Sequence, residues 1–249
     1  MLLIFYALEP EVRPFRRRLQ GLRRLEANGC VGWQGRLRDL DLTLVATGVG
    51  MERAATSARR AFELFAPVQM VVSTGVAGAL REELRAGTIV VADRLLSEST
   101  SGGAQASLEP PADRREDFVR ALTVVGLSVV VGPTLTVPTA LADAASKRRA
   151  HLESGAIAVD MESAVIAHEA RRSGLDCMYL RSVLDAVDDR LPPVRLIDEN
   201  GNVRPLTATG FFLSHPAMLF KWTPRVVRNM KIATANLAQA LESLALSQA

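Results

Sequence analysis

Residues 156–169 read Ala-Ile-Ala-Val-Asp-Met-Glu-Ser-Ala-Val-Ile-Ala-His-Glu, an apolar run that gives way to a helical pattern. The run is short and aliphatic, so it predicts a buried strand or a fragment of a buried helix. Asp160 or Ser163 can cap the helix that follows. Met161 and Glu162 then lie at the carboxyl end of a strand, where open α/β sheets bind their ligands.

Two interpretations of Glu162 remain open on this segment alone. A carboxylate beside an apolar thioether suits a sugar, because Glu162 can accept from two hydroxyls while Met161 packs on the ring. Alternatively, Glu162 only complements the dipole of the helix that it precedes, since acidic residues are common in first turns.

The overall composition indicates a folded globular chain. Its 249 residues suit one α/β domain spanning 1–249, or at most two small ones, and a hydrophobic content of 48% excludes disorder. The net charge is +3, and only three of the 30 basic residues are lysines: Lys147, Lys221 and Lys231. Arginines are dense before residue 39. A surface rich in arginine can bind phosphate or an anionic membrane, but it is more often simply exposed to solvent. Because the net charge is only +3, we expect no nucleic-acid partner.

Several classes of protein are disfavoured by the residue counts. Cys30 and Cys177 cannot build a disulfide framework, and the three histidines show no metal spacing, so we expect neither a metal nor a cofactor. Residues 1–7 are apolar without a basic flank, which argues against a signal peptide. Residues 121–142 carry no charge, but Gly132, Pro133 and Pro138 interrupt them, which favours a strand and loop over a membrane span. We therefore expect a soluble cytoplasmic protein.

The hydrophobic pattern alternates between the two periodicities of regular structure. Strands are expected at 2–7, 30–36, 40–46, 70–73, 88–92, 127–137, 156–159 and 177–183, and helices at 10–19, 51–65, 139–152, 162–173 and 224–246. The segments 97–112 and 188–215 are interpreted as irregular. This alternation predicts an α/β fold, a three-layer αβα sandwich around a mixed central sheet.

Carboxylates follow three of the expected strands. Glu11 comes after the first strand, Glu162 after the strand at 156–159, and Asp185 after the strand at 177–183. Strand ends on one side of a sheet converge, so these groups can share a pocket despite their separation in sequence.

Two glycine-rich segments also follow expected strands, Gly48-x-Gly50 and Gly75-x-x-Gly78. Glycines allow main-chain N–H groups to approach an anion or a sugar closely. Neither segment matches the dinucleotide or P-loop fingerprint, and no nucleophilic serine or cysteine elbow is evident.

Six segments in chain order resemble the nucleoside phosphorylase superfamily. They are Ala7–Val12, Thr47–Gly50, Ser73–Gly78, Ala86–Val91, Ala158–Glu162 and Arg181–Asp185. Within that superfamily the chain most resembles the methylthioadenosine/S-adenosylhomocysteine nucleosidases. Each segment is weak alone, but six in the same order are specific, and they cover the chain to about residue 190.

The resemblance implies roles for individual residues. Asp185 would hydrogen-bond purine N7, and Glu162 would hold the ribose hydroxyls. Met161 would pack against the ribose, and Glu11 would orient or deprotonate the attacking water. Other residues expected to bind substrate are Gly48, Gly75, Val76 and Arg181.

These implied roles suit cleavage of an N-glycosidic bond, which builds positive charge on the ribose and negative charge on the purine. A protonated Asp185 can donate to the departing base. Glu162 interacts more favourably as the ribose becomes cationic, which is transition-state binding. Glu11 can activate water on the opposite face, as paired carboxylates divide labour in glycosidases.

The chain departs from the family patterns around the second glycine segment. Val76 stands where the nucleosidases usually carry a serine. Val72 and Ser73 stand where hexameric phosphorylases grip phosphate with an arginine, so water and phosphate both remain open as nucleophiles. Arg53 can reach an anion, but a surface position is favoured because arginines are abundant.

The tail differs most from the nucleosidases. Residues 192–206 contain an Asn-Gly step typical of a hairpin, and an apolar aromatic stretch follows at 210–222. That stretch fits a core or subunit interface, or a wall for a large apolar 5′ substituent. Such a tail resembles the hopanoid-biosynthesis branch, which removes adenine from adenosylhopane to leave ribosylhopane.

The resulting expectation is a nucleosidase or nucleoside phosphorylase acting on adenosylhopane, a lipid-linked nucleoside. The alternatives are a methylthioadenosine/S-adenosylhomocysteine nucleosidase, a purine nucleoside phosphorylase, or a non-catalytic nucleoside or lipid-surface binding protein. We also expect a homo-oligomer, with peripheral contact to the inner membrane through the basic face. Apolar residues available for an interface are Phe211, Phe212, Leu219, Phe220 and Trp222.

Overall fold

The computed structural model describes residues 1–98, 104–189 and 216–248, without the side chains of 104–107 and 216–223. The expected hairpin at 192–206 and Phe211 and Phe212 therefore lie outside the described residues. Leu219, Phe220 and Trp222 fall within a helix, but their side chains lie outside the described part.

The strands form one mixed sheet, with helices between them along the chain. The strands are β1 (Leu2–Tyr6), β2 (Gln20–Ala27), β3 (Cys30–Leu37), β4 (Leu40–Ala46), β5 (Met70–Ala79), β6 (Ile89–Glu98), β7 (Ala104–Leu108), β8 (Val129–Thr136), β9 (Ala158–Asp160) and β10 (Cys177–Asp185). The helices are α1 (Glu9–Arg16), α2 (Met51–Leu64), α3 (Ala112–Val124), α4 (Ala144–Ser154), α5 (Ser163–Arg172) and α7 (Pro216–Leu246).

The sheet is partly closed on itself. Its order is β10-β6-β8-β9-β5-β1-β4-β3-β2, with β7 paired to β6. β1 runs parallel to β4 and β5, and β5 runs parallel to β10, whereas β6 is antiparallel to β10. Because β9 pairs with both β8 and β5, the strands β5, β10, β6, β8 and β9 form a ring. The mixed sheet is confirmed, and the ring places β9 and β10 on opposite edges of β5, where both pair with Gly78.

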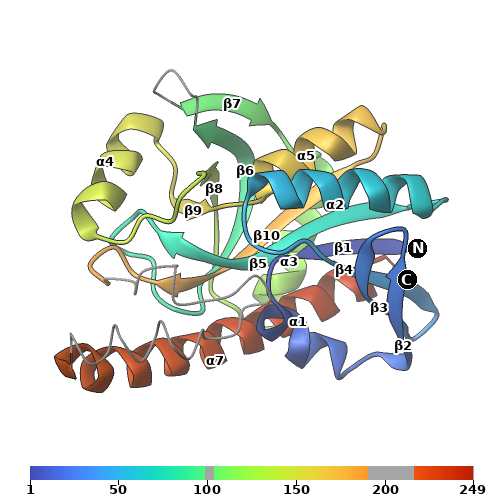
Figure 1. Cartoon of the computed structure of the whole chain (residues 1–249), viewed down its shortest axis with the longest axis horizontal. Helices are drawn as coiled ribbons and strands as arrows, with labels where there is room; N and C mark the ends of the chain where they lie inside the picture. Colours follow the sequence, from blue (N-terminus) through green and yellow to red (C-terminus); the bar gives the residue numbers. More distant parts are fainter. Residues whose placement is uncertain (99–103, 190–215, 249) are drawn as a thin grey trace.

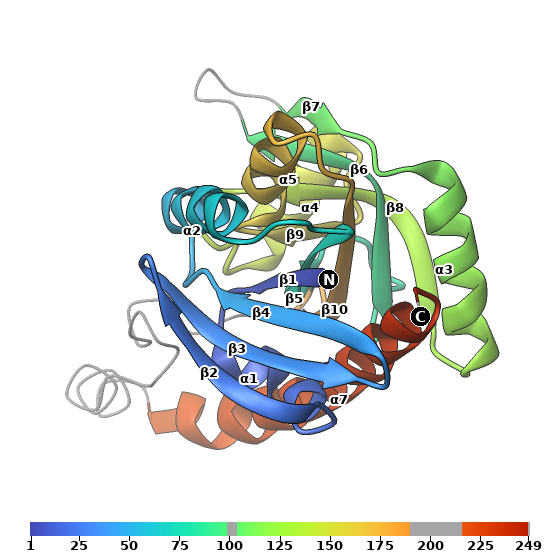
Figure 2. The same ribbon diagram turned by 90° about the vertical axis from the view of Figure 1, so that its right-hand side faces the viewer.

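Helices cover both faces of the sheet, as the sequence predicts. α2 and α5 lie on one face, and α1, α3 and α7 lie on the other (Figures 1 and 2). Alternate residues of β1 supply the two cores, since Ile4 packs with α1 and α7 whereas Phe5 packs with α2 and α5. Phe5 also meets Phe62 of α2 edge-to-face, with ring centroids 5.5 Å apart.

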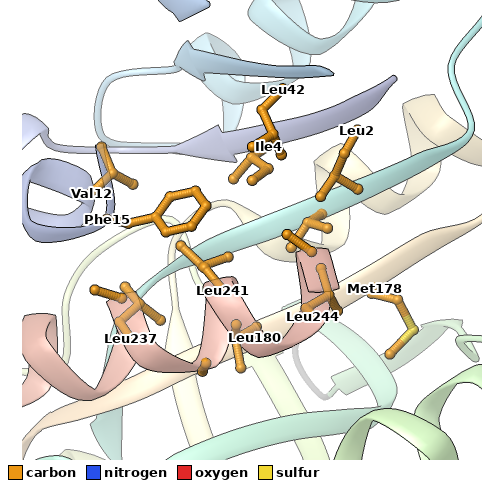
Figure 3. Close-up of a cluster of buried hydrophobic side chains, with 14 of the residues drawn as sticks. Leu2, Ile4, Val12, Phe15, Leu42, Met178, Leu180, Leu237, Leu241 and Leu244 are labelled. Atoms are coloured by element: carbon orange, nitrogen blue, oxygen red, sulfur yellow. The ribbon is translucent and has the colours of Figure 1, made fainter. Parts of the chain in front are cut away.

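The core between the sheet and the helices α1, α3 and α7 depends on the last of these helices. Leu237, Leu241 and Leu244 of α7 point towards β1 and towards Phe15 of α1 (Figure 3). All four side chains are buried. This packing anchors α1, the helix that carries Glu11.

The structure differs from the sequence-based expectation at several elements. β5 does not end at residue 73 but continues through the second glycine segment, so that segment is a strand and not a turn. β2, β7 and α3 were not expected. β2 is an edge strand with mostly exposed residues, and α3 buries only Phe118 and Leu122, so neither has a strong hydrophobic periodicity. α7 begins at Pro216 and contains Pro224 in its interior, which the sequence placed at its start.

Ion pairs neutralise part of the basic N-terminal surface. Arg16 pairs with Glu9, Arg18 with Glu242, Arg24 with Glu26, and Arg36 with Asp39 and Asp41. Arg16 also lies over the ring of Trp33. This surface therefore attracts anions less strongly than the arginine count suggests. Across the described residues, no helix is both long and apolar enough to cross a membrane.

We expect Leu241→Ala to lower the free energy of unfolding by about 2–5 kcal/mol, because it leaves a cavity between α7 and the sheet. Urea unfolding followed by far-UV circular dichroism measures the change. The matched control is Leu152→Ala on α4, where the leucine is 83% exposed, and its effect should stay within about 0.5 kcal/mol. Equal effects of the two substitutions would contradict the assignment of α7 to the core.

Candidate active site

A cavity of about 190 Å³ lies where several strands end, beside the carboxyl-terminal part of β5. Its walls are mostly apolar, and four carboxylates reach them: Glu11, Asp160, Glu162 and Asp185. The other lining residues are Ala7, Leu8, Val49, Val76, Ala77, Gly78, Val137, Ala140, Leu141, Val159, Met161 and Leu184. The sequence prediction that Glu11, Glu162 and Asp185 converge is therefore confirmed as geometry.

Glu11 is held by main-chain donors. Its Oε2 accepts from the N–H groups of Ala7 (3.0 Å) and Leu8 (2.8 Å), and its Oε1 accepts from the N–H of Val76 (3.0 Å). A Cβ on Gly75 would lie 2.8 Å from Oε1, and the φ of Gly75 is +151°. Burial raises the pKa of Glu11, while the main-chain donors and Arg181 oppose that rise. Gly75 thus gives Glu11 the space to reach β5.

Glu162 immediately precedes α5 and is almost fully buried. Its Oε1 accepts from the N–H of Gly50 (2.8 Å), the N-cap residue of α2, which has a φ of +104°. Burial, reinforced by the charge of Asp160, raises the pKa of Glu162 to about 8, and Arg181 acts in the opposite direction. The N–H of Gly50 therefore binds a protein carboxylate, where the sequence had suggested contact with a ligand.

Asp160 and Arg181 form a buried ion pair beneath Glu162. Arg181 Nε donates to Asp160 Oδ2 (2.9 Å), and its Nη2 donates to Ser73 Oγ (3.1 Å). Asp160 Oδ1 also accepts from the N–H groups of Glu162 (3.2 Å) and Ser163 (3.1 Å). The N-cap residue of α5 is Glu162, and not Asp160 or Ser163 as the sequence suggested, but the carboxylate of Asp160 accepts from the first N–H of the helix and fixes the backbone of Glu162.

Asp185 ends β10 and is paired with a lysine. Lys147 of α4 donates to Oδ2 of Asp185, and both side chains are buried. Burial raises the pKa of Asp185 to about 6, even though the charge of Lys147 lowers it. The sequence analysis missed this partner. The signal available was that Lys147 is one of three lysines in a chain of 30 basic residues.

The remaining predicted site residues divide into two groups. Met161 and Val76 line the cavity, whereas Gly48, Gly75 and Arg181 do not. Arg181 lies behind the carboxylates, and Gly75 lies beside Glu11. Arg53 is exposed on α2, as the sequence favoured.

A larger hollow of about 530 Å³ lies at the amino end of β10, near Cys177, Arg94 and Arg171. It is at the opposite end of β10 from Asp185, and both arginines are exposed. The smaller cavity is the better candidate because it gathers buried carboxylates from several elements, and burial raises the pKa values of three of them, Glu11, Glu162 and Asp185. Within the described ranges, no group of three histidine, cysteine or acidic residues is arranged to hold a metal ion.

Comparison with known proteins identifies the family. The model of the phosphorylase superfamily matches residues 2–209. The chain belongs to this superfamily. The resemblance of the six sequence segments is therefore confirmed at the level of the superfamily.

The chain is similar to a nucleosidase over part of its length. The methylthioadenosine/S-adenosylhomocysteine nucleosidase of Oceanobacillus iheyensis is 28% identical over 101 residues, which are 41% of this chain and 44% of that protein. The match thus spans less than half of that relative.

Solved structures share the fold over nearly the whole chain. The methylthioadenosine/S-adenosylhomocysteine nucleosidase of Helicobacter pylori has a TM-score of 0.77 at 18% identity, covering 100% of this chain and 98% of its own. Futalosine hydrolase of the same organism has a TM-score of 0.77 at 18% identity, and the match covers 100% of this chain and 97% of the hydrolase. The nucleosidase of Colwellia psychrerythraea, whose structure contains adenine, has a TM-score of 0.76 at 20% identity. The match covers 98% of this chain and 93% of that nucleosidase. These likenesses confirm the predicted fold.

We expect the stability of this superfamily member to depend on pH through Glu162. The folded protein keeps a proton on Glu162 up to about pH 8, whereas the ordinary pKa is 4.5. Between those values the folded state binds more protons than the unfolded state, so the contribution of this carboxyl to stability falls as pH rises.

Glu162→Gln removes that titration and should raise the Tm by about 4 °C or more at pH 9, with a smaller gain at pH 5. Differential scanning calorimetry at both pH values tests this. Glu153→Gln, at an exposed position of α4, is the control and should give the same small difference at each pH. A gain in Tm that is the same at both pH values would show that the pKa of Glu162 is not raised in the folded protein.

Proposed function

We propose that the protein cleaves the N-glycosidic bond of an adenosine-type nucleoside and releases adenine. The observation that carries this proposal is the burial of Glu11, Glu162 and Asp185 around one apolar-walled cavity. Membership of the phosphorylase superfamily supports it. The names of the similar proteins, which include adenosine-type nucleosidases, support the same substrate class.

The base of the nucleoside would lie against Asp185. A pKa of about 6 leaves a useful fraction of this carboxyl protonated near neutral pH, and the deprotonated product form is paired with Lys147. Asp185 can therefore donate a proton to purine N7 as the bond to the sugar breaks. The departing purine then leaves as a neutral molecule.

The sugar would lie between Glu162, Met161 and Glu11. Glu162 can accept hydrogen bonds from ribose hydroxyls, and half-buried Met161 can pack on the ring. Burial raises the pKa of Glu162 to about 8, and positive charge on the ribose favours its ionised form, so the attraction between them is greatest in the transition state. Glu11 is fixed by three main-chain N–H groups, so it can hold an attacking water in one orientation.

Water is the nucleophile that we propose. The described lining residues of the cavity include four carboxylates and no lysine or arginine. A phosphate dianion would be repelled by those carboxylates, whereas water would not. Ser73, which stands near the phosphate-binding position of hexameric phosphorylases, is already bonded to Arg181.

We propose adenosylhopane as the substrate, because the cavity wall suits a large apolar 5′ substituent. Side chains that give the wall this character are Leu8, Val49, Val76, Val137, Leu141 and Leu184. Each methylene that leaves water contributes about 0.8 kcal/mol, so the part of a 5′ substituent that contacts this wall would add to binding. A methylthioadenosine/S-adenosylhomocysteine nucleosidase is the second candidate, favoured by the relatives.

The proposed assembly is a homo-oligomer that contacts the membrane peripherally. Part of the N-terminal arginine surface remains available to anionic headgroups after the ion pairs are counted. A non-catalytic nucleoside or lipid-surface binding protein would use the same surface, but it would not need three buried carboxylates with restricted orientations.

Asp185→Asn should lower the rate of adenine release by about 10²-fold or more, because asparagine cannot supply the proton to N7. The assay measures free adenine from methylthioadenosine and from adenosylhopane. Asp188→Asn is the control, since Asp188 is exposed and pairs with Arg148 at the surface. Full activity of Asp185→Asn would show that this carboxyl is not the general acid.

The identity of the 5′ group is decided by direct comparison of substrates. We expect adenosylhopane to have a higher kcat/KM than methylthioadenosine, and phosphate not to change either rate. Efficient turnover of methylthioadenosine, with no turnover of the lipid substrate, would show that the protein is a methylthioadenosine/S-adenosylhomocysteine nucleosidase instead. A rate that requires phosphate would make the protein a phosphorylase.

A further inference from the structure

Lys147 is a fully buried lysine whose hydrogen bonds are all used. Its side chain is 0% exposed. The ammonium donates to Oδ2 of Asp185, to the carbonyl of Ala186 (2.8 Å) and to the carbonyl of Asp189 (3.2 Å). An ammonium has three N–H groups, so none is left for a ligand. Lys147 therefore cannot bind the purine directly while these contacts persist.

The other charges near Asp185 are already paired with one another. Asp189 accepts from the N–H of Ala186 (2.9 Å) and pairs with Arg225 of α7 (2.7 Å). Arg148 of α4 pairs with Asp188 and Glu82 at the surface. Glu11 and Glu162 face the same cavity from α1 and from the start of α5. Among the described residues, Lys147 is thus the cation in direct contact with Asp185.

A purely structural role explains this pair poorly. Burying an ammonium and a carboxylate is costly, and apolar residues of similar volume often give equal or greater stability. Two main-chain carbonyls fix the ammonium at the end of β10, and one carboxylate oxygen of Asp185 faces it. The arrangement constrains both the direction and the charge of that carboxylate.

We propose that Lys147 is a positioning residue for the leaving-group acid: it holds Oδ2 of Asp185, so that Oδ1 faces the purine. This inference rests on the proposed function. In the reaction, the proton on Oδ1 moves to purine N7 while the electron pair of the C–N bond stays on the purine. Water supplies oxygen to the sugar carbon and loses a proton to solvent through Glu11. Solvent then reprotonates Asp185, and Lys147 keeps its protons throughout.

The charge of Lys147 also makes Asp185 a stronger acid than burial alone would allow. Burial is the largest influence on the Asp185 carboxyl and raises its pKa, whereas Lys147 lowers it. Removing the ammonium leaves the burial unopposed. The carboxyl then holds its proton more tightly and has lost the partner that fixes its rotamer.

The direct test is a ¹³C NMR titration of the Asp185 carboxyl, assigned by its absence from Asp185→Asn. Lys147→Met should raise the midpoint by about one unit or more, the usual influence of an adjacent opposite charge. Lys147→Arg should stay closer to the wild type. The matched control is Arg149→Met, which removes a charge from an exposed position on the same helix and should leave the midpoint unchanged. An unchanged midpoint in Lys147→Met overturns the proposal.

The second readout separates positioning of the acid from general damage. With the nucleoside that the wild type turns over, Lys147→Met should lower kcat about tenfold. This loss is smaller than the effect of removing a general acid, because Asp185 is still present but is held less well. With 4-nitrophenyl riboside, whose leaving group needs no proton, the change should be less than about twofold. Equal losses on both substrates would indicate structural damage and overturn the proposal.

If Lys147→Met does not fold, Lys147→Gln keeps donors for the carbonyls of Ala186 and Asp189 but removes the charge, and the same criteria apply. The titration is independent of catalysis. A wild type that releases no adenine, with the midpoint of Lys147→Met still raised, would refute the proposed function but leave the Lys147–Asp185 coupling intact.

Discussion

Burial of negative charge at one end of the sheet is the constraint on which the rest of the structure depends. An ionised carboxylate away from water is costly unless it is paired or hydrogen-bonded. The strand ends meet this requirement with main-chain N–H groups, which Val76 supplies to Glu11 and Gly50 supplies to Glu162. The glycines in these segments matter because they let the backbone approach a side chain of the protein itself. The ring formed through β9 and β10 then closes the site.

Much of the fold could be predicted because it follows from local patterns. The strands with continuous aliphatic runs, such as β1 and β4, fall within about one residue of the expected bounds. The convergence of Glu11, Glu162 and Asp185 also followed, since it needs only that carboxyl ends of strands meet. The superfamily could be identified because six short segments occur in a fixed order, which a single motif would not have achieved.

The features that could not be predicted depend on contacts between distant residues. Gly75 looks like a turn residue in the sequence, but pairing with β10 keeps β5 extended through it. Lys147 lies 38 positions before Asp185, on a helix whose pattern gives no sign that its lysine is buried. The main-chain N–H groups of the two glycine segments were expected to contact a ligand, because the sequence does not show that Glu162 accepts from Gly50 and Glu11 from Val76.

The two buried cations give the site an asymmetry that matches the reaction. Arg181 lies behind the sugar side and opposes the rise that burial gives to the pKa values of Glu11 and Glu162, so it favours the ionised forms that attract a cationic ribose. Lys147 lies behind the base side and stabilises the carboxylate that remains after Asp185 has given up its proton. Neither cation lines the cavity, so neither repels the developing positive charge at close range. The protein thus places its positive charge behind the carboxylates and leaves the inner surface acidic and apolar, as the charge separation of glycosidic cleavage requires.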